Sequence, residues 1–334
     1  MARSPRARPQ PGAAIIGTGS AVPDRVVSNA EIGPPAGVDA DWIVRKTAIL
    51  ERRWARPDQA TSDLATEAAA AALRDSGIVA EQLTVIVVAT STPDRPQPPT
   101  AAYVQQRLGA PAAAAFDMNA VCSGFVFALG TVEAMIARGG GYGLVIGADI
   151  YSRILNPADR RTVPLFGDGA GAVVVGPVRG RHGIRDYALH TFGDLSPLIE
   201  VPAGGSRTPY TASTVLAGSH YFRMDGRGVR EFVTSRLPQL IKEFLADSGV
   251  VAADIAHFVP HQANGVMLDE VFAELNLPNA TVHRSVQNYG NTGAASIPIT
   301  LDAADRGGAL QPGDLILLAA FGGGMSVGLA LLTW

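Results

Sequence analysis

The sequence predicts an α/β protein made of two similar halves that share one core, each half carrying a mixed β-sheet covered by helices. Strand-like and helix-like segments alternate through both halves, which is typical of this class. Each half also closes with the same kind of motif, a Phe-Gly pair in a glycine cluster followed by an apolar strand. The two motifs read LFGDGAGAVVVG and AAFGGGMSVGLALL. The length of 334 residues suits two such units.

The first half opens with a strand and a turn in AAIIGTGSAVP. Gly17 and Gly19 invite comparison with a dinucleotide-binding loop. Val22 stands in place of the third glycine of that motif, and Pro23 blocks a following helix, so we reject a dinucleotide site.

An Ala-rich helix is expected from Thr61 to about Ser76, with capping residues at its start and Gly77 as its stop. LTVIVVAT is a continuous β-branched run, as in a strand buried on both faces. TSTPDRPQPPT, with four prolines in eleven residues, is a loop. A second helix is expected from Gly124 to Arg138, followed by strands in LVIGAD and AVVVGPV.

In the second half, residues 180–218 are rich in glycine and proline and indicate loops and short strands. A long helix is expected from Gly228 to Ser248, with a kink near Pro238. The strand IAHFVPHQ, a turn at Asn291 and a further helix follow. We divide the chain into a disordered basic tail (1–12), an N-terminal half (13–178) and a C-terminal half (179–334).

Composition limits the possible functions. A hydrophobic fraction of 47% with 17% charged residues permits a large core and a buried subunit interface. The formal charge of −3 and the few arginines near the start do not favour nucleic-acid binding. No uninterrupted apolar stretch approaches the roughly 18 residues of a membrane span, and the start lacks the apolar core of a secretory signal. A single cysteine rules out an intramolecular disulfide and fits a reducing compartment, so a cytoplasmic location is expected.

That cysteine, Cys122, is a candidate nucleophile. It lies in AFDMNAVCSGFVFALG, between an apolar strand and a helix rich in small residues. At a helix N-terminus, unpaired N–H groups and the helix dipole favour a thiolate. The alternative is an inert buried thiol, since free cysteine is among the most buried residue types.

Two motifs of the second half offer partners for this thiol. His261 follows the apolar run in VPHQAN, and Asn291 lies in the turn NYGNTGAASIP. Taken singly, the histidine is more often structural and the asparagine is usually a helix cap. The internal repeat, however, puts Cys122 and Asn291 at matching places, while His261 follows the strand that corresponds to the one ending at Thr90. A composite Cys/His/Asn site between the halves is therefore predicted.

The motifs AVCSGF, VPHQAN, YGNTGAASIP and AFGGGMS resemble the β-ketoacyl-acyl-carrier-protein synthase III group of thiolase-fold condensing enzymes. IIGTGSAVP, DWIVRKTAILERRWA and LFGDGAGAVVV are similar to the same group, so the resemblance covers about residues 13–334. It implies the thiolase fold, with five layers in the order αβαβα.

The resemblance implies an acyltransferase that performs a decarboxylative Claisen condensation. An acyl-CoA starter acylates Cys122, and a malonyl-acyl-carrier protein then loses CO2 and attacks the acyl group, which initiates a fatty-acid or polyketide chain. His261 and Asn291 would stabilise the enolate as uncharged donors. The Cys122 amide and the Gly323 amide would form the oxyanion hole, although the glycines could be a tight turn only. No metal and no cofactor are implied, because acyl-CoA is a substrate.

The resemblance also assigns binding residues. Trp42, Lys46, Arg160 and Asn264 are expected to bind CoA, although Trp42 could equally be a core aromatic. The acyl pocket would be closed by Gln97 and Pro98 from a loop shared across a homodimer.

The chain departs from the group at the surface that would meet the acidic carrier protein. On the expected carrier-binding helix, Asp269, Glu270 and Glu274 stand where lysines are common. In the expected CoA-binding segment, Lys46 replaces an arginine and loses its two-pronged phosphate geometry. Two alternatives therefore stay open: an acyltransferase of specialised metabolism with an oxygen or nitrogen acceptor, and a Cys-dependent hydrolase or non-catalytic acyl-binding relative. The sequence does not identify the starter group, the pathway or the carrier of the malonyl group.

Overall fold

The computed structural model describes residues 12–178 and 183–334, and these contain two five-stranded sheets with the same strand order. The first sheet runs β1-β7-β6-β4-β5 and the second runs β8-β14-β13-β11-β12. In the first sheet β6, β4 and β5 are parallel to one another, and β7 is antiparallel to β6. In the second sheet β13, β11 and β12 are parallel in the same way, and β14 is antiparallel to β13. The repeat predicted from the sequence is therefore confirmed strand by strand.

The strands of the first sheet are β1 (Gly12–Ala21), β4 (Leu83–Ala89), β5 (Ala114–Met118), β6 (Tyr142–Ile150) and β7 (Asp168–Val178). Those of the second sheet are β8 (Gly183–Thr191), β11 (His257–Pro260), β12 (Thr281–Val282), β13 (Leu315–Gly322) and β14 (Ser326–Thr333). The predicted tail 1–12 lies outside the described residues except for Gly12, which begins β1. The predicted boundary at 178/179 adjoins residues 179–182, which also lie outside them.

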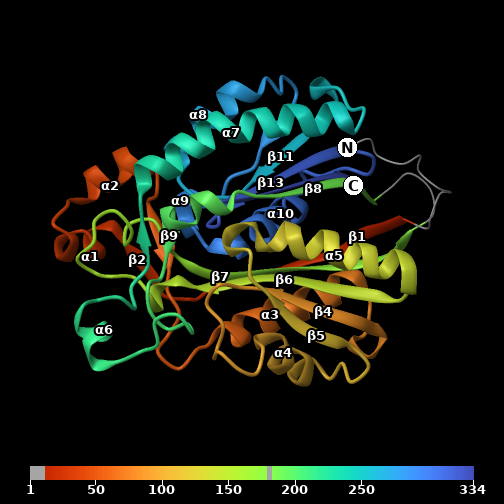
Figure 1. Cartoon of the computed structure of the whole chain (residues 1–334). Coiled ribbons are helices and arrows are strands. Elements are labelled where there is room, and N and C mark those ends of the chain that lie inside the picture. Colours follow the sequence, from red (N-terminus) through yellow and green to blue (C-terminus); the bar gives the residue numbers. More distant parts are fainter. Residues whose placement is uncertain (1–11, 179–182) are drawn as a thin grey trace.

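Helices cover the sheets in the predicted five-layer arrangement (Figure 1). The outer face of the first sheet carries α3 (Thr61–Ser76) and α4 (Thr100–Leu108), and that of the second carries α7 (Gly226–Asp247) and α8 (Gly265–Leu275). The central layer is formed by α5 (Gly124–Gly139) and α10 (Ser296–Arg306). The helix from Gly226 continues through Pro238.

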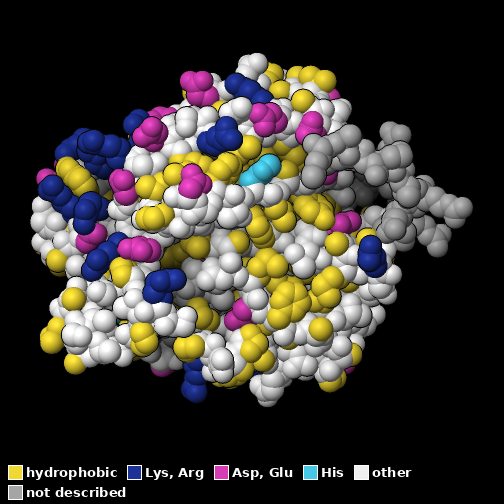
Figure 2. All heavy atoms as spheres, in the orientation of Figure 1, with side chains coloured by type: hydrophobic (Ala, Val, Ile, Leu, Met, Phe, Trp, Pro, Cys, Tyr) yellow, Lys and Arg dark blue, Asp and Glu magenta, His cyan; other side chains and the backbone are white. Residues whose placement is uncertain are grey.

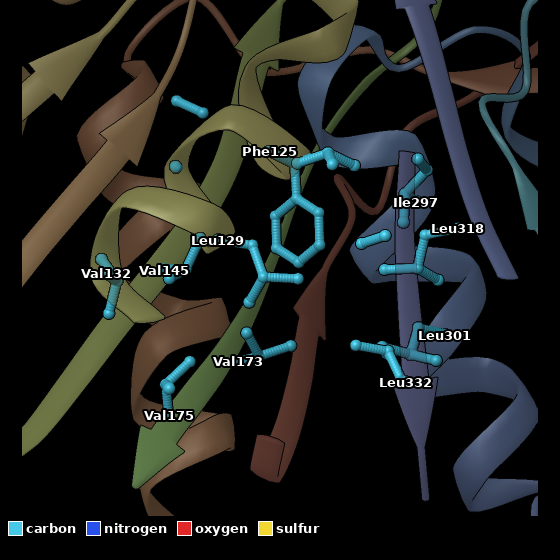
Figure 3. Packing of buried hydrophobic residues seen from close by; sticks show 14 of the residues in the cluster. Phe125, Leu129, Val132, Val145, Val173, Val175, Ile297, Leu301, Leu318 and Leu332 are labelled. Carbon is cyan, nitrogen blue, oxygen red and sulfur yellow. The ribbon is translucent and has the colours of Figure 1, made fainter. Parts of the chain in front are cut away.

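The central layer joins the halves through one apolar core (Figure 3). Phe125 and Leu129 of α5 point toward side chains of α10 and of both sheets, and all of them are fully or almost fully buried. Burying a large apolar side chain stabilises the fold by roughly 1.5–3 kcal/mol. Two further clusters fill the spaces between each sheet and its outer helices.

The glycines of the rejected dinucleotide motif serve this packing. A Cβ atom at Gly19 would lie 2.4 Å from the Ala72 backbone nitrogen, and one at Gly17 would lie 2.6 Å from the Ser76 nitrogen. Only glycine therefore lets α3 lie this close to β1. The helix ends as predicted at Gly77, which adopts a left-handed conformation.

The segment Val121–Gly139 is, by length and composition only, apolar enough to cross a membrane, although Thr131, Glu133 and Arg138 interrupt its apolar residues. It is the one such segment among residues 12–178 and 183–334. Because it includes the central helix α5, which packs between the two sheets, it is a core helix of this fold.

Short elements surround one end of the molecule. They are the helices α1 (Asn29–Ile32), α2 (Ala40–Thr47), α6 (Ala212–Leu216) and α9 (Val286–Tyr289), and the strands β2 (Val26–Ser28), β3 (Glu51–Arg53), β9 (Ile199–Glu200) and β10 (Arg223–Met224). Lys and Arg side chains gather near the α2 end of the surface (Figure 2). Helix α2 is joined to the start of α8 by a hydrogen bond from the Asn264 side chain to the Lys46 carbonyl oxygen, at 3.1 Å.

Candidate active site

Cys122, His261 and Asn291 line one cavity of about 580 Å³. Cys122 belongs to a 3₁₀ turn that leads into α5, His261 directly follows β11, and Asn291 precedes the 3₁₀ turn at the start of α10. The two turns, Val121–Ser123 and Gly293–Ala295, hold the same place in the two halves and contact each other. The duplicated topology therefore brings together side chains that are up to 169 positions apart in the sequence, from Cys122 to Asn291.

Cys122 is 7% exposed and its turn is held on the second half. The neighbouring Ser123 hydroxyl donates to the Ser326 carbonyl oxygen at 3.0 Å. Burial raises the pKa of the Cys122 thiol to about 12, with a further contribution from the Asp149 carboxylate, while hydrogen bonding by Tyr151 lowers it. This direction is opposite to the one expected from the helix N-terminus alone, because loss of solvation opposes the thiolate more strongly. The resting group is a thiol.

His261 is buried and uncharged. Burial lowers the pKa of its imidazole to about 3, so the imidazole is in its neutral form at pH 7. Its Nδ1 lies 2.7 Å from the Ser296 hydroxyl. The imidazole and the Phe321 ring pack nearly perpendicular to each other, with 5.0 Å between ring centroids. The expected neutral imidazole therefore has a structural basis in this site.

Asn291 is held by its backbone and by one side-chain atom. Its N–H donates to the Leu165 carbonyl oxygen at 2.8 Å, and its carbonyl oxygen accepts from the Gly167 N–H at 3.0 Å. Its Oδ1 accepts from the Gly293 N–H at 2.9 Å, a local bond of the helix-cap kind. This bond orients the amide, and within the described residues Nδ2 is left as a donor beside the cavity.

The end of β13 packs closely against the candidate nucleophile. A Cβ atom at Gly322 would lie 2.7 Å from the Cys122 backbone nitrogen and 2.9 Å from its Cβ. Gly322 lines the cavity, whereas Gly323, the predicted oxyanion donor, is placed next to it and accepts the Ser326 hydroxyl on its carbonyl oxygen at 3.0 Å. The turn is both a tight connection between strands and a wall of the site, and the role of the Gly323 amide stays a prediction.

All four residues predicted to bind CoA line the same cavity: Trp42, Lys46, Arg160 and Asn264. Trp42 is half-buried and also packs against an apolar cluster, so its two interpretations are compatible. The Asn264 side chain caps α8, since its Oδ1 accepts from the N–H groups of Val266 and Met267. Part of its hydrogen-bonding capacity is thus used by the fold.

The acidic side chains of α8 have arginine partners that the sequence did not indicate. Glu270 makes a two-pronged ion pair with Arg230 of α7, at 2.7 and 2.9 Å, and both residues line the cavity. Asp269 pairs with Arg284. This face is therefore less acidic than the spacing of carboxylates along α8 suggested.

Gln97 and Pro98, predicted to close the acyl pocket, are exposed and lie outside this chain's cavity. The prediction placed them in the pocket of a partner subunit, so their role stays a prediction.

Two polar groups next to the site were missed by sequence reasoning. The Tyr151 hydroxyl lies 2.9 Å from the Ser91 hydroxyl, which donates to the Asp149 carboxylate at 3.1 Å. Tyr151 follows β6, at the sheet edge that also carries the Cys122 turn, and its place after a buried strand was the available signal. The other group is Ser296, which lies five positions after Asn291 in the GNTGAAS turn.

Comparison with known proteins gives a consistent result. Residues 245–334 match the family model of the 3-oxoacyl-[acyl-carrier-protein] synthase III C terminal, and residues 116–193 match that of 3-oxoacyl-[acyl-carrier-protein] synthase III. The acetoacetyl CoA synthase NphT7 of Streptomyces sp. (strain CL190) is 68% identical, with 96% of this chain and 98% of that protein covered. A β-ketoacyl-[acyl-carrier-protein] synthase III of Rhodopirellula baltica is 42% identical, with 97% and 99% covered.

Among solved structures, the 3-oxoacyl-[acyl-carrier-protein] synthase III of Aquifex aeolicus superposes with a TM-score of 0.88 at 36% identity. The superposition covers 97% of this chain and 100% of the Aquifex aeolicus chain. The priming β-ketosynthase of the R1128 polyketide pathway gives a TM-score of 0.90 at 30% identity, with 99% and 98% covered.

Proposed function

Since this chain belongs to the 3-oxoacyl-[acyl-carrier-protein] synthase III family, we propose that Cys122, His261 and Asn291 perform its decarboxylative condensation of an acyl-CoA with a malonyl thioester. The enzyme is a condensing acyltransferase. The observation that carries the residue assignment is the meeting of one thiol and two uncharged hydrogen-bond donors in a single cavity.

In the first half-reaction, the Cys122 sulfur attacks the carbonyl carbon of the acyl-CoA thioester. The new carbon–sulfur bond forms, the bond to the CoA sulfur breaks, and the thiol proton leaves with CoA as its free thiol. The backbone amides of Cys122 and Gly323 hold the oxyanion of the tetrahedral intermediate. Because the resting thiol has a pKa of about 12, the proton must be moved during acylation rather than before substrate binds.

In the second half-reaction, the malonyl carboxyl group leaves as CO2 and its bonding electrons pass into a thioester enolate. His261 Nε2–H and Asn291 Nδ2–H donate to the enolate oxygen. The enolate carbon then attacks the acyl group, the bond to the Cys122 sulfur breaks, and the sulfur takes up a proton from solvent. An imidazole with a pKa of about 3 does not protonate the carbanion, which would waste the malonyl unit as an acetyl thioester.

The same property of His261 weighs against acyl transfer to an oxygen or nitrogen acceptor and against hydrolysis of the thioester. Acyl transfer to an alcohol, an amine or water requires a base that removes a proton from the acceptor. A buried imidazole whose pKa is lowered to about 3 is a poor base at neutral pH. Condensation needs no such base, because loss of CO2 generates the nucleophile.

For the substrates, we propose an acetyl-CoA starter and malonyl-CoA as acceptor, giving acetoacetyl-CoA. Support comes from the 68% identical relative that is named for this product. Support also comes from α8, where Glu270 and Asp269 with their arginine partners replace the basic surface expected for an acidic carrier protein. Malonyl-acyl-carrier protein is the second candidate, since the family model bears its name.

We further propose a homodimer in the cytoplasm. Strand β5 lies at the free edge of the first sheet, and its residues are only partly buried in the single chain. Edge strands of this kind pair readily with a second copy. The exposed Gln97 and Pro98 loop would then reach the partner's acyl pocket. Sedimentation of the purified protein as a monomer would contradict this assembly.

The central experiment separates the two half-reactions. Wild-type protein incubated with acetyl-CoA should gain one acetyl group by intact-mass measurement, and Cys122→Ala should gain none. His261→Ala and Asn291→Ala should still load acetyl but release little CO2 from malonyl thioesters, with a loss of roughly 10²–10³ per donor in the condensation rate. Normal loading of Cys122→Ala, or condensation that survives in both other variants, would refute the assignment.

The carrier of the malonyl group is tested in the same assay. Malonyl-CoA and malonyl-acyl-carrier protein are offered in turn to the acetylated enzyme. Formation of acetoacetyl-CoA with little acetoacetyl-carrier supports the proposed acceptor, whereas the reverse preference identifies the second candidate as correct.

A further inference from the structure

We propose that Ser296 is a positioning residue that fixes the tautomer of His261, so that its Nε2 carries the proton and serves as the donor to the enolate. This inference rests on the proposed function of His261 and adds the group that prepares it.

The hydrogen bonds around Ser296 determine which nitrogen is protonated. The Ser296 Oγ lies 2.7 Å from His261 Nδ1 and also accepts the backbone N–H of Gln262, at 3.3 Å. The Gln262 N–H can only donate, so among the described residues His261 Nδ1 is the one hydrogen-bond partner that can accept the proton of the Ser296 hydroxyl. Nδ1 then acts as acceptor, and a neutral imidazole must carry its proton on Nε2.

Both partners are held firmly. His261 and Ser296 are each 1% exposed. The His261 backbone N–H donates to the Ala319 carbonyl oxygen at 2.8 Å, and the Ser296 carbonyl oxygen accepts the Thr300 hydroxyl at 2.7 Å. Because the Phe321 ring also packs against the imidazole, the imidazole has little freedom to turn Nδ1 away from the serine.

A hydroxyl at Nδ1 leaves His261 Nε2–H as a hydrogen-bond donor, which a carboxylate at the same place would not. A carboxylate would accept a hydrogen bond from Nδ1–H, which favours the tautomer protonated at Nδ1 and stabilises the imidazolium. A serine adds no charge, so burial alone governs the ring and holds it neutral. The arrangement thus favours donation over base catalysis.

One turn contains one enolate donor, Asn291, and the hydroxyl that orients the other, His261. The segment from Asn291 to Ser296 contains the Gly293 N–H that orients the Asn291 amide and the hydroxyl that orients His261. A single sequence motif therefore orients the Nδ2–H of Asn291 and the Nε2–H of His261.

The kinetic test uses three variants of the full-length enzyme. Ser296→Ala should load acetyl from acetyl-CoA at close to the wild-type rate, whereas kcat for condensation should fall about tenfold to a hundredfold, with a smaller change in KM for the malonyl thioester. Ser296→Thr keeps the hydroxyl and should restore most of the loss. Ser285→Ala is the matched control, because it removes a buried hydroxyl whose hydrogen bond joins it to the Thr300 hydroxyl, at 2.6 Å.

The tautomer is read directly by nitrogen NMR of protein labelled with ¹⁵N-histidine, with the His261 signals assigned from their loss in His261→Ala. The wild type should show a protonated Nε2, Ser296→Ala should gain the Nδ1–H form, and Ser296→Asp should shift to it and raise the pKa of the ring. An unchanged tautomer in Ser296→Ala together with wild-type condensation overturns the proposal. If the wild type loads acetyl but does not condense, the proposed function fails while the NMR result still decides the role of Ser296.

Discussion

Gly322 is the position at which one added methyl group should disable the nucleophile. It is the last residue of β13, and Gly322→Ala would place a Cβ atom 2.7 Å from the Cys122 nitrogen, 2.9 Å from its Cβ and 3.1 Å from its Cα. Two of these three atoms belong to the backbone of a buried residue. A rotamer change therefore cannot relieve the overlap, and the 3₁₀ turn or the glycine turn must move.

The size of the effect follows from the packing. Overpacking a close-packed interior typically costs 1–3 kcal/mol, so a loss of roughly that size is expected in the free energy of unfolding. The Cys122 sulfur and its amide move together, because both belong to the displaced residue. A misplacement of about 1 Å lowers the rate of a positioned reaction roughly a hundredfold, and we expect that loss in acylation.

Acylation is measured in a single turnover, as the gain of mass on the protein after mixing with acetyl-CoA, and stability is measured by urea denaturation. Gly139→Ala is the control, since it adds the same methyl group at the far end of α5, where no atom lies within 4 Å of the new Cβ. That variant should acylate normally and be as stable as the wild type or slightly more stable. Gly322→Ala with the wild-type acylation rate and an unchanged urea midpoint would refute the reasoning.

Three other perturbations test the electrostatics of the site and the fold. Tyr151→Phe removes a hydroxyl that lowers the pKa of Cys122, so alkylation of the thiol by iodoacetamide between pH 7 and 9 should slow severalfold, and an unchanged rate would exclude a contact with the sulfur. Burial and the neighbouring His257 lower the pKa of His283 from 6.5. The unfolded chain therefore binds more protons than the folded chain below about pH 6.5, and the folded state loses stability as the pH falls. His283→Gln should reduce this loss, which is measured by comparing urea midpoints at pH 7 and pH 5. An identical pH dependence in both proteins would contradict this. Glu270→Gln removes a carboxylate from the cavity lining, and because that carboxylate repels the CoA phosphates, KM for CoA thioesters should fall. The decrease should be larger at low salt than at high salt. An unchanged or higher KM would show that the carboxylate does not act on the CoA phosphates.

The duplicated fold could be predicted because each half repeats a local pattern. The Phe-Gly motifs before β7 and β14, and the matching turns at Cys122 and Asn291, depend on neighbouring residues in the chain. The ends of helices were predictable for the same reason, as at Gly77, where a left-handed conformation stops α3. Strand order and sheet pairing then followed the repeat.

The meeting of the three candidate catalytic residues in one cavity could also be predicted, since His261 directly follows β11 while Cys122 and Asn291 lie at matching turns before α5 and α10. Their protonation could not. The helix N-terminus at Cys122 favours a thiolate, yet burial between two halves raises the pKa to about 12, and that burial exists only once the second half has packed against the first.

The sequence by itself determined the repeat, the family and the position of one thiol, one imidazole and one amide along the chain. Tertiary structure alone decided the partners of these groups: Ser296 at His261, Tyr151 near Cys122, and Arg230 at Glu270. Each of these pairs joins residues between 29 and 40 positions apart. The physical reason is that hydrogen bonding and desolvation depend on which atoms meet in space, and no local pattern specifies that meeting.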